Sequence, residues 1–265
     1  MDLNLKGKRA VVTGSTAGIG YAAARELAAM GATVAINGRT QARVDAAIAK
    51  LKGEVPGATF IAAPGDLGSA QGAIDLVRAA PDADILVNNA GIFEPKPFFA
   101  IPDEDWMRFF ETNVLSGVRL ARHYTLKMIE RRWGRVVFIS SESGLHIPTE
   151  MVHYGMTKTA QIAVARGLAE TVAGTGVTVN SVLPGPTMSE GVSVFMSKMA
   201  GGTTGPNLEQ AGRDFIRKHR PTSLIGRVAT VEEVASMIAY VCSPAASATS
   251  GAALRVDGGV VRAIP

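Results

Sequence analysis

A tyrosine and a lysine stand four residues apart in the stretch HYGMTKTA, residues 153–160. Both side chains titrate near pH 10 in water, so neither is a ready proton carrier at neutral pH. In a helix the two would share one face, where the ammonium group of Lys158 would favour the phenolate form of Tyr154 and lower its pKa. The spacing indicates either two ordinary surface side chains or a tyrosine tuned for general acid–base catalysis.

More polar side chains precede this pair. The expected strand 135–141 (RVVFISS) ends in Ser140 and Ser141, and a hydroxyl there could hydrogen-bond a substrate oxygen. Glu142 and His146 follow in the next loop. Because loops beside a site often contact its ligand, His146 is a minor candidate for substrate contact. The sequence does not indicate whether Glu142 faces the same site.

A glycine-rich segment, VVTGSTAGIG, lies between the first expected strand and the first expected helix. Gly14, Gly18 and Gly20 would let the backbone turn sharply and approach a pyrophosphate at the helix N-terminus. A Walker A loop is excluded because no Lys-Ser/Thr follows. The alternative is a tight turn without a ligand. The other residues of the segment expected to contact a cofactor are Ser15, Thr16 and Ile19.

The second expected strand ends in Asn37-Gly38-Arg39, without the acidic residue that holds the ribose 2′-hydroxyl of NAD. A guanidinium can hold a 2′-phosphate through two hydrogen bonds. Arg39 therefore favours NADP(H), while NAD(H) stays possible and a solvated arginine is the alternative.

Short β-branched runs alternate with alanine-rich helical stretches, which predicts an α/β fold: one Rossmann-like, doubly wound parallel sheet of about seven strands with helices on both faces. The even spacing predicts a single domain, 1–265. Residues 188–226 break the pattern and contain several methionines, which suggests a flap over a pocket; a poorly patterned surface insertion is the alternative. The expected strands are 9–14, 32–39, 58–66, 84–91, 135–141, 177–185 and 253–259.

Composition narrows the class of protein. Of the 265 residues, 47% are hydrophobic and 19% are charged, which suits a buried core, and the net charge of +4 is dispersed, which argues against nucleic-acid binding. The densest basic group, Arg131, Arg132 and Arg135, suggests a helix end. No run approaches the ~20 apolar residues that span a bilayer. The single cysteine, Cys242, fits a reducing, cytoplasmic setting and a packed, inert thiol.

The remaining histidines suggest no metal site. His123 and His219 have no partners at metal-ligand spacing, and no H-E-x-x-H or paired-cysteine pattern occurs. His153 adjoins Tyr154, but consecutive helix positions do not face each other, so we do not expect it to be catalytic.

The motifs together resemble the short-chain dehydrogenase/reductase family in its single-domain form, from about residue 7 to residue 259. This resemblance implies that Tyr154 exchanges a proton with the substrate oxygen, that Ser141 orients that oxygen, and that Lys158 binds the nicotinamide ribose. The family's thirteen-residue spacing selects Ser141 over Ser140. The matching segments are TGSTAGIG, Asp66, NNAG (88–91), Asn113, Ser141, Tyr154-x-x-x-Lys158 and PGPT (184–187).

The resemblance also implies further roles. Asn113 would hold a water in a proton relay to the lysine, although at the start of the expected helix 113–132 it could simply be a cap. Helices 113–132 and 152–173 would form the contact surface of a homotetramer or homodimer. Ser189 replaces a threonine that the family often has, and keeps the hydroxyl. The residues implied to line the cofactor are Asp66, Leu67, Asn89, Ala90, Gly91, Pro184, Gly185, Thr187 and Ser189, with Tyr154 and Lys158.

We therefore expect an NADP-preferring oxidoreductase that interconverts an alcohol and a ketone or aldehyde. An apolar ketone, a 3-oxoacyl thioester and a polyol all remain possible substrates. A non-catalytic NADP sensor on the same fold is the alternative, although it would be expected to lose the tyrosine or the lysine. A sugar-nucleotide epimerase is disfavoured by the NNAG motif and the short chain.

Overall fold

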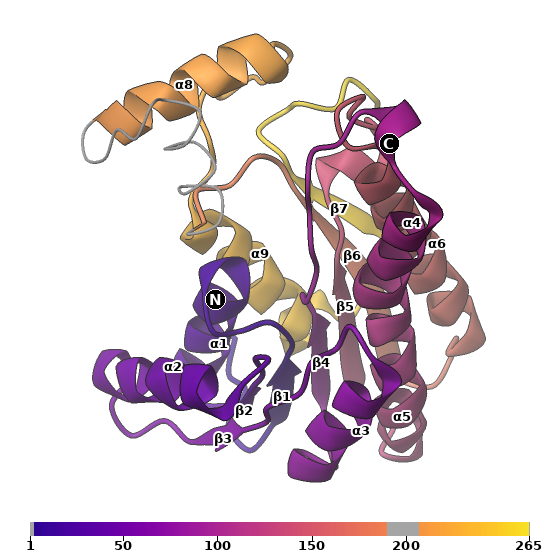
Figure 1. Cartoon of the computed structure of the whole chain (residues 1–265). Helices are drawn as coiled ribbons and strands as arrows, with labels where there is room; N and C mark the ends of the chain where they lie inside the picture. The colour runs from indigo at the N-terminus through magenta and orange to yellow at the C-terminus, as the bar shows by residue number, and fades with distance from the viewer. Residues whose placement is uncertain (1–2, 190–206, 265) are drawn as a thin grey trace.

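A parallel sheet of seven strands forms the centre of the computed structural model, which describes residues 3–189 and 207–264. The spatial order is β3-β2-β1-β4-β5-β6-β7, so the winding direction reverses between β1 and β4 (Figure 1). In such sheets ligands bind at the carboxyl ends of the strands near this reversal. The strands are β1 (Arg9–Val12), β2 (Thr33–Ile36), β3 (Phe60–Ala62), β4 (Ile85–Asn88), β5 (Gly134–Ile139), β6 (Val177–Pro184) and β7 (Ala253–Val256).

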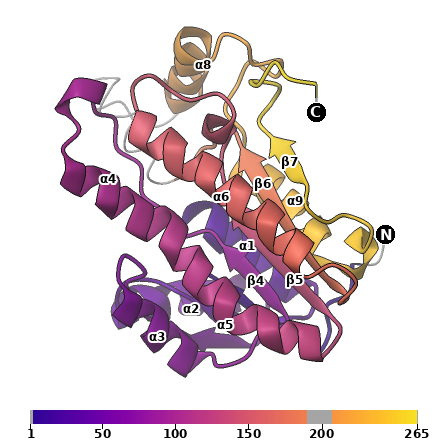
Figure 2. The same ribbon diagram turned by 90° about the vertical axis from the view of Figure 1, so that its right-hand side faces the viewer.

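Helices cover both faces of the sheet. On one face lie α1 (Gly18–Ala29), α2 (Gln41–Glu54) and α9 (Val231–Cys242); on the other lie α3 (Ala70–Ala79), α5 (Ser116–Glu130) and α6 (Val152–Thr171) (Figure 2). The strands pack against both layers: in β1, Val12 joins the core beneath α1, whereas Val11 joins the core beneath α3 and α5. Burial on both faces explains their nearly continuous apolar sequences and confirms the expected fold class.

Helix α4 (Asp103–Phe110) continues through a π-helical turn, Glu111–Leu115, directly into α5. The sequence predicts a helix over 113–132, and the structure joins the helix in this region to α4. Asn113 lies inside the wide turn rather than at a helix end. Its expected role as a helix cap is therefore wrong, because a residue within a continuous helix has no free first-turn amides to cap.

The expected flap, 188–226, contains the amphipathic helix α8 (Asn207–His219), which the sequence reading treats as irregular. Residues 190–206, which include Phe195, Met196 and Met199, lie outside the described residues, so the Met-rich part of the flap stays a prediction. Arg135 also differs from expectation. It lies within β5, is buried, and donates from Nε to the carbonyl of Ser243 at 3.2 Å, instead of completing a helix end.

Among the described helices, none is long and apolar enough to cross a membrane. Within the same residues, no group of three or more His, Cys, Asp or Glu side chains is placed to hold a metal ion.

The tightest packing of the glycine loop lies at Gly20 in α1. A Cβ atom there would overlap the Asn89 amide and come within 2.5 Å of the Gly14 carbonyl oxygen. We predict that Gly20→Ala lowers the free energy of unfolding by ~1–3 kcal/mol, measured by urea denaturation. Gly53→Ala in α2 is the matched control: no atom lies within 4 Å of the added methyl, so stability should rise by ~0.5–1 kcal/mol. Equal stability of the two variants would contradict this packing.

Candidate active site

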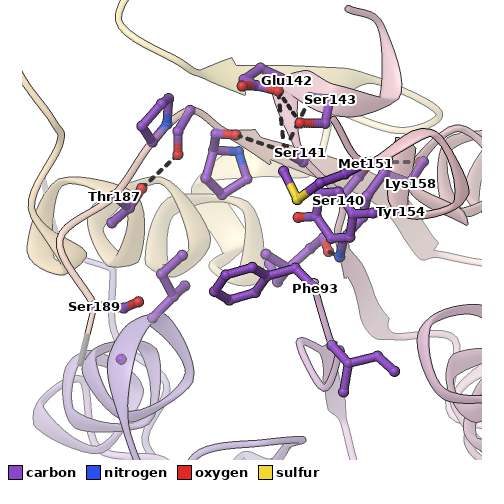
Figure 3. A pocket seen from close by; sticks show the side chains of 18 of the residues that line it. Phe93, Ser140, Ser141, Glu142, Ser143, Met151, Tyr154, Lys158, Thr187 and Ser189 are labelled. Atoms are coloured by element: carbon purple, nitrogen blue, oxygen red, sulfur yellow. Dashed lines mark hydrogen bonds between the residues drawn. The ribbon is translucent and has the colours of Figure 1, made fainter. Parts of the chain in front are cut away.

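The carboxyl ends of β5 and β6 and the start of α6 enclose a pocket of about 640 Å³ (Figure 3). This volume suits a small ligand. Eleven of the residues predicted from sequence line it: Gly18, Ile19, Asn89, Gly91, Ser141, Tyr154, Lys158, Pro184, Gly185, Thr187 and Ser189. The other predicted residues lie outside this lining: Gly14, Ser15, Thr16, Gly20, Arg39, Asp66, Leu67, Ala90 and Asn113.

Ser141 directly follows β5 and begins a short 3-10 turn, Glu142–Gly144. Its buried Oγ accepts the amide N–H of Ser143 at 3.1 Å, which holds the hydroxyl over the pocket. The neighbouring Ser140 points elsewhere, because its Oγ donates to the Lys158 carbonyl at 2.7 Å. Both serines line the pocket, but the hydroxyl of Ser140 is bonded to the backbone of α6, which leaves the hydroxyl of Ser141 as the better placed one for a substrate.

Lys158 is buried and has no carboxylate partner among the described residues. Its Nζ donates to the carbonyl of Ile139 at 2.9 Å and to Oε1 of Gln161 at 3.0 Å. Burial lowers the pKa of Lys158 to about 7, because the charged form loses its hydration. The lysine can therefore change its charge near neutral pH.

Tyr154 lies one helical turn before Lys158, with the lysine Nζ 5.5 Å from the ring centroid. Burial raises the pKa of Tyr154 to about 12, and the hydrogen bond with Ser141 only partly offsets this rise. The expectation that Lys158 lowers the pKa of Tyr154 is wrong in this structure, because loss of hydration outweighs any nearby charge. At neutral pH Tyr154 is a protonated phenol.

Asn113 connects the π-helical turn to the site. Its side chain accepts the Ile92 amide at 2.8 Å and donates to the Ile92 carbonyl and to Thr157 Oγ1, each at 3.0 Å. The main-chain carbonyl of Asn113 accepts Nε2 of Gln161 at 2.7 Å. Gln161 therefore links Lys158 to Asn113. The sequence reading missed Gln161, because a glutamine three residues after a helical lysine is unremarkable by itself.

The glycine loop leaves helix α1 ready for an anion. Gly14 and Gly18 both have φ of 59°, a conformation that favours glycine. Ala17 at the N-cap of α1 makes no side-chain cap, whereas side chains of Thr40, Ser69 and Thr230 cap α2, α3 and α9. The first amides of α1 thus remain available, and they fit the pyrophosphate of a dinucleotide. Ser15 stabilises the loop: its Oγ donates to the carbonyl of Val12 and accepts the amide N–H of Asn37.

Three polar side chains hold the loops together, and the sequence reading assigned none of them this role. Thr13 Oγ1 accepts the amides of Asn89 and Ala90, each at 2.8 Å. Asn37, buried after β2, accepts the Gly14 amide at 3.1 Å and donates to the carbonyl of Ala63 at 2.9 Å. Asn89 donates to the Thr13 carbonyl at 2.9 Å. A buried polar residue directly after a strand was the available signal.

The remaining cofactor candidates lie along the same edge of the sheet. Arg39 is exposed after β2, and its side chain makes no hydrogen bond or ion pair with another described residue. Asp66 is exposed after β3, where its Oδ1 accepts the Gly68 amide at 3.1 Å, and Leu67 beside it is buried.

Two histidines lie apart from the site. His146 is exposed and does not line the pocket, so substrate contact by it is not supported. His153 is fully buried with its ring 4.1 Å from that of Phe109, and burial lowers its pKa. Its ring nitrogens have no hydrogen-bond partner in the described part of the chain.

Cys242 is buried at the end of α9, where burial raises the pKa of its thiol to about 12.

Glu142 and Arg220 answer a question that the sequence left open. Both line the pocket and are buried, and Arg220 Nε donates to Glu142 Oε1 at 2.8 Å. Arg220 directly follows α8 and was not among the predicted site residues. Two other arginines of the flap, Arg213 and Arg217, are instead exposed and paired with Glu209 and Asp214, and Lys198 lies outside the described residues.

Comparison with known proteins agrees with this geometry. A family model described as short chain dehydrogenase matches residues 8–199. The chain belongs to this family. It is 48% identical, over the full length of both chains, to the uncharacterized oxidoreductase YvaG of Bacillus subtilis. It is 31% identical to the 3-oxoacyl-[acyl-carrier-protein] reductase FabG of Aquifex aeolicus, covering 98% of this chain and 100% of the relative. L-sorbose reductase from Gluconobacter frateurii, complexed with NADPH and L-sorbose, superposes with a TM-score of 0.92 at 29% identity, covering 100% of both chains.

As a short-chain dehydrogenase, this protein is an oxidoreductase that interconverts an alcohol and a carbonyl with a nicotinamide cofactor. The resemblance read from the motifs is thereby confirmed, as is the reaction class. The order of the motifs along the chain was sufficient for both.

The buried lysine of this short-chain dehydrogenase should lower its stability. With a pKa near 7 instead of 10.5, folded Lys158 binds fewer protons than the unfolded chain between these values, so wild-type stability rises with pH across that window. We predict that Lys158→Met raises the free energy of unfolding by roughly 2–4 kcal/mol at pH 6, and that the gain shrinks at pH 9.

Urea denaturation at both pH values measures this difference. Lys52→Met, on the exposed side of α2, is the control and should show no pH-dependent difference from wild type. A Lys158→Met protein that is less stable than wild type at pH 6 would show that the ammonium is not costly to bury.

Proposed function

We propose that this protein is an NADPH-dependent ketone reductase in which Tyr154 is the general acid. One observation carries the proposal: Ser141, Tyr154 and Lys158 line one pocket beside the uncapped start of α1. The hydroxyl groups of Ser141 and Tyr154, which could bind a carbonyl oxygen, thus lie next to a helix start that could bind the pyrophosphate of a dinucleotide. The test is the oxidation of NADPH, followed by absorbance, with a panel of ketones that includes a 3-oxoacyl thioester and a ketose.

In the proposed reaction the substrate oxygen lies between the hydroxyl groups of Ser141 and Tyr154. NADPH, when bound, supplies the hydride to the carbonyl carbon. Ser141 orients the oxygen, and Tyr154 gives its proton to that oxygen, which completes the alcohol. A pKa of about 12 keeps Tyr154 protonated at neutral pH, so the proton to be transferred is present. The ammonium group of Lys158 then lies near the tyrosine phenolate and stabilises its negative charge. Gln161 positions Lys158 and is itself bonded to the carbonyl of Asn113.

Replacing the acid tests this assignment. We predict that Tyr154→Phe lowers kcat by ~10²–10⁴-fold, because the proton donor is lost, while the dissociation constant for NADPH, measured by fluorescence titration, changes little. Tyr240→Phe, on the far helix α9, is the matched control and should keep wild-type turnover. Near-native turnover by Tyr154→Phe would rule out the mechanism.

The preference for NADP(H) is also a proposal, and it rests on Arg39. This exposed guanidinium follows β2, the position from which a side chain reaches the adenosine ribose, and no carboxylate stands there to repel a 2′-phosphate. L-sorbose reductase, the structural relative at 29% identity, is complexed with NADPH. We also propose that Asp66 and Leu67, which follow β3, contact the adenine side of the cofactor.

Charge reversal at Arg39 should alter cofactor choice. We predict that Arg39→Asp lowers kcat/KM for NADPH by roughly 10–100-fold, which is the value of one or two charged hydrogen bonds, and improves use of NADH. The control is Arg43→Asp, the same charge change one turn further into α2, which should alter the ratio of the two cofactors far less. Unchanged selectivity in Arg39→Asp would mean that another residue holds the 2′-phosphate.

The proposal extends to organisation and location. We expect a single domain, 1–265, with residues 188–226 as a flap, and a homotetramer or homodimer whose subunits meet through α5 and α6. Exposed Leu126 on α5 supports an apolar contact there. A buried lone cysteine suits the cytoplasm. Light scattering after size-exclusion chromatography tests the assembly.

A further inference from the structure

A buried ion pair lies beside the hydroxyl of Ser141. The side chains of Glu142 and Arg220 are only 3% and 7% exposed, and Nε of the arginine donates to Oε1 of the glutamate at 2.8 Å. The other carboxylate oxygen, Oε2, accepts from Ser143 Oγ and, at 3.4 Å, from Ser141 Oγ (Figure 3). The glutamate is thus in contact with a residue that the proposed mechanism places on the substrate.

Arg220 uses three of its five N–H donors on protein groups, and its Nη2 group makes no hydrogen bond with another described residue. Besides Glu142, its Nη1 group donates to the His219 carbonyl at 2.8 Å and to Glu150 Oε1 at 3.3 Å. Burial alone would lower the pKa of Arg220, but the two carboxylates raise it, so the guanidinium stays charged and is held between them. Two carboxylates against one guanidinium leave this end of the pocket with a net charge of −1.

Lys158, the other cation among the described residues that line the pocket, is also hydrogen-bonded within the protein. Lys158 donates two of its three N–H groups to Ile139 and Gln161, and the family resemblance implies that it holds the cofactor ribose. The remaining titratable lining residue, His219, stacks on Phe215 and buries its Nε2 without a hydrogen-bond partner in the described part of the chain. The rest of the substrate end is largely apolar, with Phe93 and Met151 among its walls.

We infer that Glu142 makes this pocket select neutral ketones and reject keto acids. A carboxylate brought next to the carbonyl would meet the buried negative charge of Glu142, whereas Arg220, the cation beside it, is already paired with two carboxylates. At low dielectric the resulting repulsion is strong. A neutral hydroxyl or amide group could instead donate to the carboxylate oxygens. Glu142 thereby acts as a specificity residue, and the inference rests on the proposed reductase function.

The experiment compares two substrates of equal size, acetoacetamide and acetoacetate, by NADPH absorbance at pH 7.5. For the wild-type enzyme we expect kcat/KM to favour the amide by at least about tenfold. Glu142→Gln keeps the shape, removes the charge and frees Arg220 to meet an anion, so this preference should fall by about tenfold or more. Glu150→Gln, at the half-exposed partner of Arg220, should move the preference in the same direction by less.

Asp214→Asn is the matched control, because it removes the same charge from the exposed Arg217–Asp214 pair on α8 and should leave the preference unchanged. Equal rates on the two substrates by the wild-type enzyme, or an unchanged preference in Glu142→Gln with Glu150→Gln also unchanged, would overturn the inference and leave the reductase function standing. If the wild-type enzyme reduces no ketone at all, the proposed function fails and the inference fails with it.

Discussion

The burial of the Lys158 ammonium group is the constraint on which the rest of the site depends. A cation removed from water needs acceptors in fixed places, and here the carbonyl at the end of β5 and the amide of Gln161 provide them. Gln161 in turn bonds the carbonyl of Asn113 in the π-helical turn. One charge thus ties a strand end, helix α6 and the α4–α5 helix to each other, and Tyr154 takes its position from the same helix.

The cofactor half and the substrate half of the site, both at the carboxyl ends of the strands, are held together by different kinds of interaction. Under the cofactor half, neutral side chains join loop to loop, with Thr13, Asn37 and Asn89 satisfying backbone groups that would otherwise be buried unpaired. In the substrate half, a buried ion pair between Glu142 and Arg220 connects the turn after β5 with the residue after α8. The loops of the cofactor half are thus held together by neutral side chains, whereas the Glu142–Arg220 pair places buried charges beside Ser141.

The sequence predicts most of the fold because strands buried on both faces must be continuously apolar, and seven such runs alternate with helices. It points to Tyr154, Lys158 and a serine at the end of β5 because these lie close together in sequence on one strand and one helix, and the family resemblance selects Ser141. The Glu142–Arg220 contact could not be predicted in this way, because the two residues are 78 positions apart. In addition, Arg220 follows α8, a helix that the hydrophobic pattern of the sequence did not reveal. Likewise, the pKa of Tyr154 depends on burial, which a list of neighbouring charges in sequence does not measure.

The state of Cys242 has a practical consequence. The chain's single thiol is buried and held as the neutral thiol, and the thiolate is the form that reacts with alkylating reagents. The folded enzyme should therefore tolerate maleimide and iodoacetamide without modification. A second cysteine placed on the exposed face of α8 could then carry a fluorescent or spin label in an otherwise native background, which would report whether that helix moves during turnover.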